Sequence, residues 1–389
     1  MVGAAAGPAS EVVDGGLEDV EDTAGVAGSA APVAGHGRRV GRAILARMPE
    51  AAARDDVALT EIMAARDRLA GTVHRTPLLS SATAADWIRS ATGIRVGDDR
   101  LHLKAEHLQK TGSFKARGMT NRIETLAAEA KARGVITLSA GNAGQAYAWA
   151  GRSAGVPVTV VMPAAAVRSK VDACLGYGAR VVLHGAHVGE TFSEMERIRD
   201  AEGLTLVHPF DDAAVIAGHG TAGVEIVEDL PAVDVVVVPV GGGGLISGIA
   251  AAVKALRPGV RVYGVEPERS NAVSLGLAAG EVVRLQPESV ADGLGAPFTG
   301  VLPLAIVRRL VDEIVLLDDP TILAGLRFGL ERLKQVLEPA GSAALAAVLA
   351  GRIPLRTGDR VAVILSGGNV EIGRLGELLA AAGPLPGGA

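Results

Sequence analysis

Regular alternation of apolar runs and helix-length segments begins near Asp56 and restricts the fold more than any other feature. Runs rich in Val, Ile and Leu at 135–139, 157–162 and 234–238 are each followed by a segment of helical length. Strands separated by helices lie parallel, with right-handed crossovers. The run at 234–238 lacks the alternation of a half-buried strand, which predicts a strand covered on both faces. The sequence therefore predicts an α/β fold with parallel-type twisted sheets and helices on both faces.

The strand–helix units are too numerous for one sheet, so we expect two lobes. The large lobe should take residues 56–133 and 211–382, and a small inserted lobe residues 134–210. Residues 1–55 are rich in Ala, Gly and Val without sustained periodicity, which predicts a disordered extension. Residues 383–389 are expected to form a flexible tail. A ligand bound between two such lobes is expected to draw the small lobe closed.

Composition narrows the classes of function. Lysine and arginine together number 38 against 43 aspartates and glutamates, and aromatic residues are only 3%, which argues against nucleic acid as a partner. No apolar run reaches the length of a membrane span, and the start of the chain lacks the pattern of a secretory signal. The single cysteine, Cys174, excludes an internal disulfide framework and a cysteine-rich zinc site. We expect a cytoplasmic protein.

Lys115 lies at the start of a predicted helix, in the segment Gly112-Ser113-Phe114-Lys115. Gly112 permits a tight approach, and Ser113 is expected to cap a helix that runs to about Ala132. The positive end of a helix lowers the pKa of a lysine in its first turn and favours the neutral amine that forms imines. A surface lysine would occupy such a position equally well, so position alone does not assign this role.

Four consecutive glycines, Gly241 to Gly244, connect a predicted strand to a predicted helix. Backbone N–H groups without side chains at a helix N-terminus form an anion cradle, which is typical of phosphate sites. The dinucleotide fingerprint fails because its sixth position holds Ile246 or Ser247, and the nucleoside-triphosphate loop fails because its lysine is missing. Glu266 ends the next predicted strand, where a ribose-binding acid would lie, so a nicotinamide cofactor stays open.

Two further loops follow predicted strands. The loop Ser139–Ala143 opens a helix at Asn142 and offers free amides and a side-chain amide, which suit a carboxylate. After the last strand, Ser366 offers one neutral hydroxyl that can donate or accept a hydrogen bond. Each loop alone is equally an ordinary helix cap. All the loops lie at C-terminal strand ends or helix starts, where open α/β sheets bind ligands, and together they predict one site.

With these motifs in this order, the chain resembles the serine/threonine dehydratase group of pyridoxal-phosphate enzymes, which share the tryptophan-synthase-β fold type. The resemblance covers about Asp56 to Leu379. It implies a two-lobed fold of type II and pyridoxal 5′-phosphate as the cofactor. It rests on the segments Gly112–Gly118, Ser139–Gln145, Gly241–Gly244 and Leu365–Asn369, and on the landmarks His74–Leu78, Ala291–Gly293 and Glu338–Gly341.

The resemblance also implies a role for each motif. Lys115 anchors the cofactor covalently and then acts as acid and base at the α-carbon. Ser366 bonds the pyridine nitrogen, and a neutral hydroxyl there leaves the nitrogen largely unprotonated, which favours rapid β-elimination. The substrate carboxylate is bound by Ser139, Ala140, Gly141, Asn142 and Ala143. The other implied cofactor contacts are Phe114 beside the ring, Asn142 at the 3′-oxygen, and the amides of Gly241, Gly242, Gly243, Gly244 and Leu245 at the phosphate.

The implied reaction is elimination from a small β-hydroxy amino acid: L-threonine to 2-oxobutanoate and ammonia, and L-serine to pyruvate. We also expect a homodimer or a higher homo-oligomer. Ala140 matches threonine dehydratases, whereas serine racemases carry serine there; a 3-hydroxyaspartate dehydratase or a serine racemase is the alternative. A nicotinamide-dependent oxidoreductase is a rival from another class. An inactive ligand-binding relative is a third, because Ala143 and His219 replace the family's usual His and Gln.

A divalent cation is a further expectation from the resemblance. Racemase-like members bind one through two acids and a carbonyl oxygen. Glu266 matches the first acid and Ala272 the carbonyl, but Ser274 falls where the second acid is expected. Oxygen ligands would favour Mg²⁺ or Ca²⁺.

Overall fold

The computed structural model describes residues 54–386. Nearly all of the extension predicted to be disordered, and the last three residues of the predicted tail, lie outside the described part. No helix within residues 54–386 combines the length and the apolarity needed to cross a membrane.

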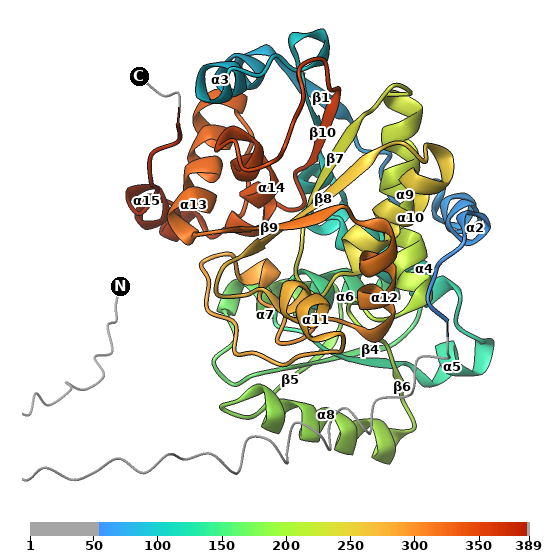
Figure 1. The fold of residues 1–389 in the computed structure, drawn as a ribbon. Helices are drawn as coiled ribbons and strands as arrows, with labels where there is room; N and C mark the ends of the chain where they lie inside the picture. The colour runs from blue at the N-terminus through green and yellow to red at the C-terminus, as the bar shows by residue number, and fades with distance from the viewer. Residues whose placement is uncertain (1–53, 387–389) are drawn as a thin grey trace, which may run out of the picture. The chain divides into compact units, whose positions relative to one another are not determined.

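The larger of two sheets is mainly parallel (Figure 1). Its strands are β1 (Leu78–Ser81), β2 (Leu101–Lys104), β7 (Val235–Pro239), β8 (Arg261–Pro267), β9 (Glu313–Leu317) and β10 (Val361–Ile364). They lie in the order β1-β2-β10-β7-β8-β9. Every neighbouring pair is parallel except the edge pair β1 and β2, which is antiparallel. The predicted α/β class with parallel-type sheets is confirmed, with one antiparallel edge strand.

The central strand β7 is covered by helices on both faces. Val235 and Val237 pack in one core with residues of α3 (Ala82–Thr92), α13 (Asp319–Phe328) and α14 (Pro339–Leu349). Val236 and Val238 pack in another core with residues of α9 (Ala213–Asp229) and α10 (Gly244–Leu256). Because successive side chains of a strand point to opposite faces, a strand between two helical layers has no polar side. The prediction that the run at 234–238 forms a strand covered on both faces is therefore confirmed.

A second, smaller sheet lies between residues 135 and 206. Its strands are β3 (Val135–Leu138), β4 (Val158–Met162), β5 (Arg180–Leu183) and β6 (Thr205–Leu206), parallel in the order β5-β4-β3-β6. The helices of this stretch are α6 (Asn142–Ala154), α7 (Arg168–Gly176) and α8 (Val188–Glu202), and α8 lies on the side of the sheet away from the large sheet (Figure 1). All four strands fall within the range 134–210 expected for the small lobe, whose boundaries stay a prediction.

The helix predicted from Ser113 to Ala132 is wrong in two respects. It is two helices, α4 (Lys115–Glu124) and α5 (Ala128–Arg133), separated by a short turn. Ser113 also does not cap α4. It is extended and bridges Gly367, and its buried hydroxyl has no hydrogen-bond partner among the described residues. Pairing with the chain after β10 holds the Ser113 side chain away from the first amides of the helix.

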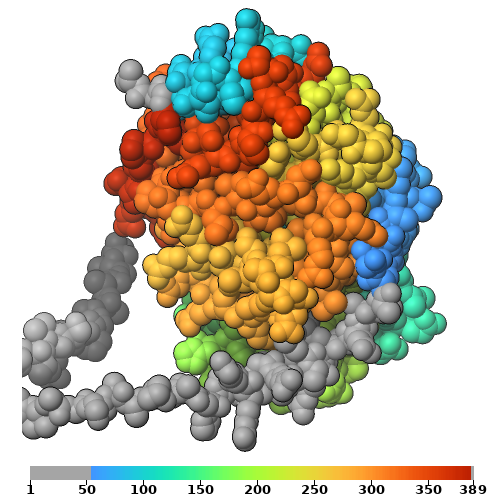
Figure 2. Space-filling view, viewed as in Figure 1, coloured from blue at the N-terminus to red at the C-terminus, as the bar shows by residue number. Residues whose placement is uncertain are grey.

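The chain between β8 and β9 forms a large part of the surface on the face drawn in Figure 2, where it is coloured yellow to orange. It contains α11 (Ala272–Ala279) and α12 (Val301–Leu310) and two stretches without regular structure. The remaining long helices are α2 (Leu59–Leu69) and α15 (Ile372–Ala380).

Candidate active site

Lys115 is the first residue of α4, so it lies in the first helical turn as predicted. Its Nζ donates a hydrogen bond to the carbonyl of Pro209 at 2.9 Å and lies 5.1 Å from the centroid of the Phe114 ring. Burial lowers the pKa of Lys115 to about 8. The expected direction of the shift is therefore present, but loss of water around the amine causes it rather than the helix end. About a fifth of this amine is therefore neutral near physiological pH, far more than of an ordinary lysine.

The segment before Lys115 is fixed against the end of β10. The amide of Phe114 donates to the carbonyl of Ser366 at 3.1 Å. Gly112 has a φ of 71°, and a Cβ there would lie 2.3 Å from the side-chain oxygen of Asn369. Glycine is required at this position for both reasons. These contacts hold the segment of Lys115, the predicted cofactor anchor, beside Ser366, which is predicted to bond the pyridine nitrogen.

The glycine loop turns into α10 through Gly243, whose φ of 91° is in the left-handed region. A Cβ on Gly242 would lie 2.5 Å from the ring of Phe210, and a Cβ on Gly244 would lie 2.9 Å from the Phe210 carbonyl oxygen. The glycines thus allow Phe210 to approach the loop, and they add no side chains of their own over the amides of the helix N-terminus. Phe210 follows Pro209, the hydrogen-bond partner of Lys115, so the loop and the lysine border the same region.

The loop predicted to hold a carboxylate is shaped by its own serine. The hydroxyl of Ser139 accepts hydrogen bonds from the amides of Gly141 at 3.3 Å and Gly144 at 3.1 Å. Gly141 is the N-cap of α6, and Asn142 and Ala143 occupy the first turn. Amides in a first turn have no partner within the helix and point out of its end. Ser139 therefore organises the loop, and the amides that follow it remain for a ligand.

Asn142 follows a strand of the small sheet, and its side chain is held by two side chains from the region of the large sheet. Its Nδ2 donates to Glu338 Oε1 at 2.7 Å, and its Oδ1 accepts from Asn369 Nδ2 at 2.9 Å. Glu338 is buried, and burial raises its pKa to about 7, with the charge of Asp292 acting in the same direction. The sequence identified Glu338 only as a landmark. An acid directly before the apolar helix α14 was the signal that could have identified it as a site residue.

Ser366 carries a buried hydroxyl that is available for a hydrogen bond to a ligand. It is 3% exposed, and the nearest acceptor for its Oγ is the carbonyl of Ala340 at 3.5 Å. A buried hydroxyl with one long contact is poorly satisfied. A desolvated amine, a glycine loop at a helix N-terminus and this hydroxyl together fit pyridoxal 5′-phosphate, which needs an imine-forming lysine, phosphate donors and a partner for its ring nitrogen.

His219 packs edge-on against Phe114, with ring centroids 4.8 Å apart. Both ring nitrogens are buried without a hydrogen-bond partner among the described residues, and burial holds the pKa of His219 well below its usual value. The imidazole is therefore neutral. It packs against Phe114 at the position where Gln is usual in the family that the chain resembles.

The carboxylate of Glu266 is already engaged by three hydrogen-bond donors. Its carboxylate accepts hydrogen bonds from the amides of Val273 and Ser274 at 2.9 Å each, and from the Ser274 hydroxyl at 2.7 Å. Ala272 lies at the start of the same turn. Residues 54–386 contain no group of three or more His, Cys, Asp and Glu side chains that could hold a metal ion. Mg²⁺ and Ca²⁺ need about six or more oxygen ligands, and these residues do not fit one.

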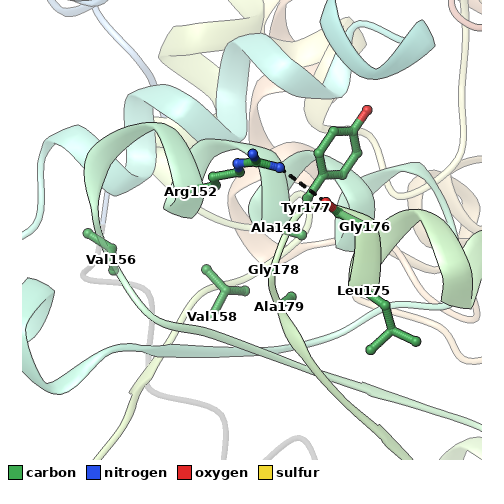
Figure 3. Close-up of a pocket in the computed structure, with 9 residues that line it drawn as sticks. All are labelled: Ala148, Arg152, Val156, Val158, Leu175, Gly176, Tyr177, Gly178 and Ala179. Carbon is green, nitrogen blue, oxygen red and sulfur yellow. Dashed lines mark hydrogen bonds between the residues drawn. The ribbon is translucent and has the colours of Figure 1, made fainter.

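A surface pocket of about 240 Å³ lies elsewhere, between α6, β4 and the turn from α7 to β5 (Figure 3). Its charged side chain is Arg152, whose guanidinium donates to the carbonyl of Gly176 at 3.1 Å. The rest of the lining is mostly apolar side chains and glycine backbone. No residue of the predicted site lines this pocket, and it carries no acid, base or nucleophile suited to elimination.

Comparison with known proteins gives consistent matches. The model of the pyridoxal-phosphate dependent enzyme family matches residues 69–367. An L-threonine ammonia-lyase of Thermotoga maritima is 40% identical over 83% of this chain and 78% of its own length. A catabolic L-threonine dehydratase of Escherichia coli is 39% identical, over 83% of this chain and 96% of its own. The structure of maize serine racemase superposes with a TM-score of 0.77 at 34% identity, covering 83% of this chain and 97% of that one.

The matched range contains Lys115, the loop at Asn142, the glycine loop and Ser366, which are the parts that the structure brings together. Family membership thus agrees with the geometry of the site. This chain belongs to the pyridoxal-phosphate dependent enzyme family.

Proposed function

We propose that this protein is a lyase that removes water and ammonia from L-threonine, giving 2-oxobutanoate, and that it also converts L-serine to pyruvate. The observation that carries the proposal is the desolvated Lys115 amine, which is linked to the glycine loop through Pro209 and Phe210 and to Ser366 through the backbone of Phe114. The relatives named as threonine ammonia-lyase and threonine dehydratase support this reaction.

Pyridoxal phosphate, when bound, supplies the electron sink that lets an α-proton and a β-hydroxyl leave an amino acid. Lys115 is proposed to hold the cofactor and to move the proton at the α-carbon, as the neutral amine that its pKa of about 8 provides. Ser366 would offer a hydroxyl, and not a carboxylate, to the ring nitrogen. Phe114, with His219 packed against it, would lie beside the ring, and Asn142 is aligned by Glu338 and Asn369.

The phosphate and the substrate carboxylate are proposed to use different helix ends. The amides from Gly241 to Leu245 suit the phosphate, and the amides of the loop from Ser139 to Ala143 suit the carboxylate. Each set lies at the start of a helix, α10 and α6 respectively. A substrate held this way lies between residues of both sheets.

Ala140 supports elimination over racemisation. Racemisation requires a proton donor on the face of the α-carbon opposite Lys115, and a methyl side chain cannot donate a proton. A 3-hydroxyaspartate dehydratase is the neighbouring alternative among eliminations. We assign no step to a divalent cation, because the donors around Glu266 already occupy its carboxylate.

We further propose that the enzyme acts in the cytoplasm as a homodimer or higher homo-oligomer. The single cysteine of the chain, which is buried, is consistent with a reducing compartment. Light scattering during size-exclusion chromatography would measure the assembly, and a monomer at micromolar concentration would contradict the second part of this proposal.

The test is the absorbance spectrum of the purified protein beside those of Lys115→Ala and a control, Lys131→Ala, which changes a lysine paired with Glu124 on the surface. The wild type and the control should carry the yellow colour of lysine-bound pyridoxal phosphate, and Lys115→Ala should not. L-Threonine should then yield 2-oxobutanoate with the first two proteins alone. A yellow wild type that leaves both L-threonine and L-serine unchanged would contradict the proposed substrates, and a protein that cannot be made yellow would contradict the reaction class.

A further inference from the structure

Arg284 lies in the surface segment between α11 and α12, where it pairs with the chain that runs back toward the glycine loop. Arg284 and Phe298 form an isolated antiparallel bridge, and the amide of Leu285 donates to the carbonyl of Pro297 at 2.9 Å. The guanidinium carbon of Arg284 lies 4.8 Å from the centroid of the Phe298 ring. This contact is a cation–π interaction, which fixes the direction of the side chain but uses none of its N–H groups in a conventional hydrogen bond.

The guanidinium of Arg284 is short of hydrogen-bond acceptors. Its Nε and Nη2 are buried and have no hydrogen-bond partner among residues 54–386. No carboxylate of the described residues forms an ion pair with it, and burial lowers the pKa of Arg284 with no neighbouring acid to oppose the shift. A buried N–H of a charged group without an acceptor costs free energy, so such a group is usually satisfied by an oxyanion.

The Phe298 ring, which contacts Arg284, is connected to the candidate active site through a second aromatic ring. The ring of Phe298 packs edge-on against that of Phe210, with centroids 5.6 Å apart. Phe210 in turn occupies the space where a Cβ of Gly242 would lie and follows Pro209, which accepts the Lys115 hydrogen bond. Arg284 is thus two aromatic rings away from the glycine loop.

We propose that Arg284 is an oxyanion-binding residue at the edge of this active site, which takes a carboxylate or a phosphate oxygen through its Nε and Nη2. These two donors point the same way and match two oxygens of one anion. One source is a distal carboxylate on the side chain of a β-hydroxy amino acid, which would extend the substrate range beyond L-threonine. The other source is the phosphate of the cofactor at the neighbouring glycine loop. The substrate branch rests on the proposed function, whereas the binding of an anion does not.

The experiment compares the holoenzyme with Arg284→Gln, which keeps the size and removes the charge, and with Arg284→Lys, which keeps the charge. Arg352→Gln is the matched control, because Arg352 is exposed and precedes β10, at the opposite strand end from the site. Binding of malonate, a small dicarboxylate, is measured by thermal shift, and release of pyridoxal phosphate is measured after dilution. Rates are measured with L-threonine and with 3-hydroxyaspartate.

If the anion is a substrate carboxylate, Arg284→Gln should weaken malonate binding and raise the KM for 3-hydroxyaspartate by about tenfold or more. The KM for L-threonine should stay within about twofold. For 3-hydroxyaspartate, the KM of Arg284→Lys should fall between those of the wild type and of Arg284→Gln. If the anion is the cofactor phosphate, Arg284→Gln should release the cofactor about tenfold more readily, with all substrates affected alike. Unchanged malonate binding and unchanged cofactor release in a folded Arg284→Gln would overturn the proposal. Malonate binding remains informative even if neither hydroxy amino acid reacts.

Discussion

At the scale of single residues, the site depends on groups whose protonation is shifted by burial. Lys115 is shifted toward the neutral amine, and Glu338 toward the neutral acid. Both shifts have the same physical origin, because a charge loses hydration when protein replaces water around it. The consequence is that an amine and an acid on either side of the site both titrate near neutral pH.

The first prediction concerns reconstitution of the apoenzyme with pyridoxal phosphate. The neutral amine is the reactive form of Lys115, so the rate should be low under acidic conditions and rise with pH. The midpoint should lie near pH 8, and not near the value of 10.5 of an ordinary lysine. Stopped-flow absorbance across this range would measure it. A midpoint above pH 10 would show that burial does not lower this pKa.

A second prediction concerns Glu338 and stability. The pKa of Glu338 is raised to about 7 in the folded protein from 4.5, so the folded state binds more protons than the unfolded state between these values. This contribution to stability is fully present below about pH 4.5 and is lost as the pH rises through 7. Glu338→Gln, which keeps an oxygen for Asn142, should therefore make the free energy of unfolding of the apoenzyme less dependent on pH in this window. Urea unfolding measures it, with Glu129→Gln on the exposed face of α5 as the control.

At the scale of elements, a buried ionic cluster joins α4 to β2 and α9. Arg117, 1% exposed, contacts Glu106 through Nε at 2.8 Å and Glu225 through Nη1 at 2.6 Å. Lys104 pairs with Glu225 at 2.5 Å. Two cations and two anions thus balance in the interior. Arg117 is two residues after Lys115, so this cluster fixes the helix that carries the candidate catalytic amine.

The third prediction follows from this cluster. Arg117→Met should lower the free energy of unfolding by about 3–5 kcal/mol, because it leaves the fully buried Glu106 without its main partner. Chemical denaturation would measure the loss. Arg68→Met on α2, which loses a part-buried contact to Asn121, is the comparison and should cost much less. A loss below about 1 kcal/mol for Arg117→Met would mean that the cluster contributes little.

At the scale of the whole described fold, polar contacts join the region of the small sheet to the rest of the chain. Lys170 of α7 pairs with Asp292, and Ser169 donates to Glu371 at 2.7 Å. The hydrogen bond from Asn142 to Glu338 joins the same two regions of the chain. These polar contacts are partly exposed, and we expect them to break when the predicted small lobe opens to admit a ligand.

The fourth prediction is that Lys170→Ala favours the open arrangement. Because a partly exposed ion pair contributes about 1 kcal/mol or less, the KM for L-threonine should rise by at most about fivefold, with kcat little changed. Arg168→Ala, which removes an ion pair within α7, should leave the KM unchanged. Steady-state kinetics at low and high salt would distinguish them, since salt should weaken the wild-type pair and reduce the difference. Equal KM values for all three proteins at low salt would rule out this role.

Local patterns made much of the fold predictable. Apolar runs such as 234–238 identify strands because a strand between two helical layers has no polar face, and glycine at 241–244 identifies a close approach because other residues add a Cβ. The helix starts at Lys115, Asn142 and Gly244 could be predicted for similar reasons. The cap at Ser113 could not, because the competing partner, Gly367, is distant in sequence and is brought close by pairing after β10.

The sequence by itself therefore determined the fold class and the order of the motifs, since each depends on neighbouring residues and their periodicity. The cofactor followed from the family that these motifs resemble. Only the tertiary structure decided which side chains meet across the site. Glu338 reaches Asn142 from 196 positions away, and Arg284 approaches the glycine loop through Phe298 and Phe210. It also decided the charge of Lys115 and Glu338, because burial depends on how much protein packs around a group, and no local pattern of residues specifies that.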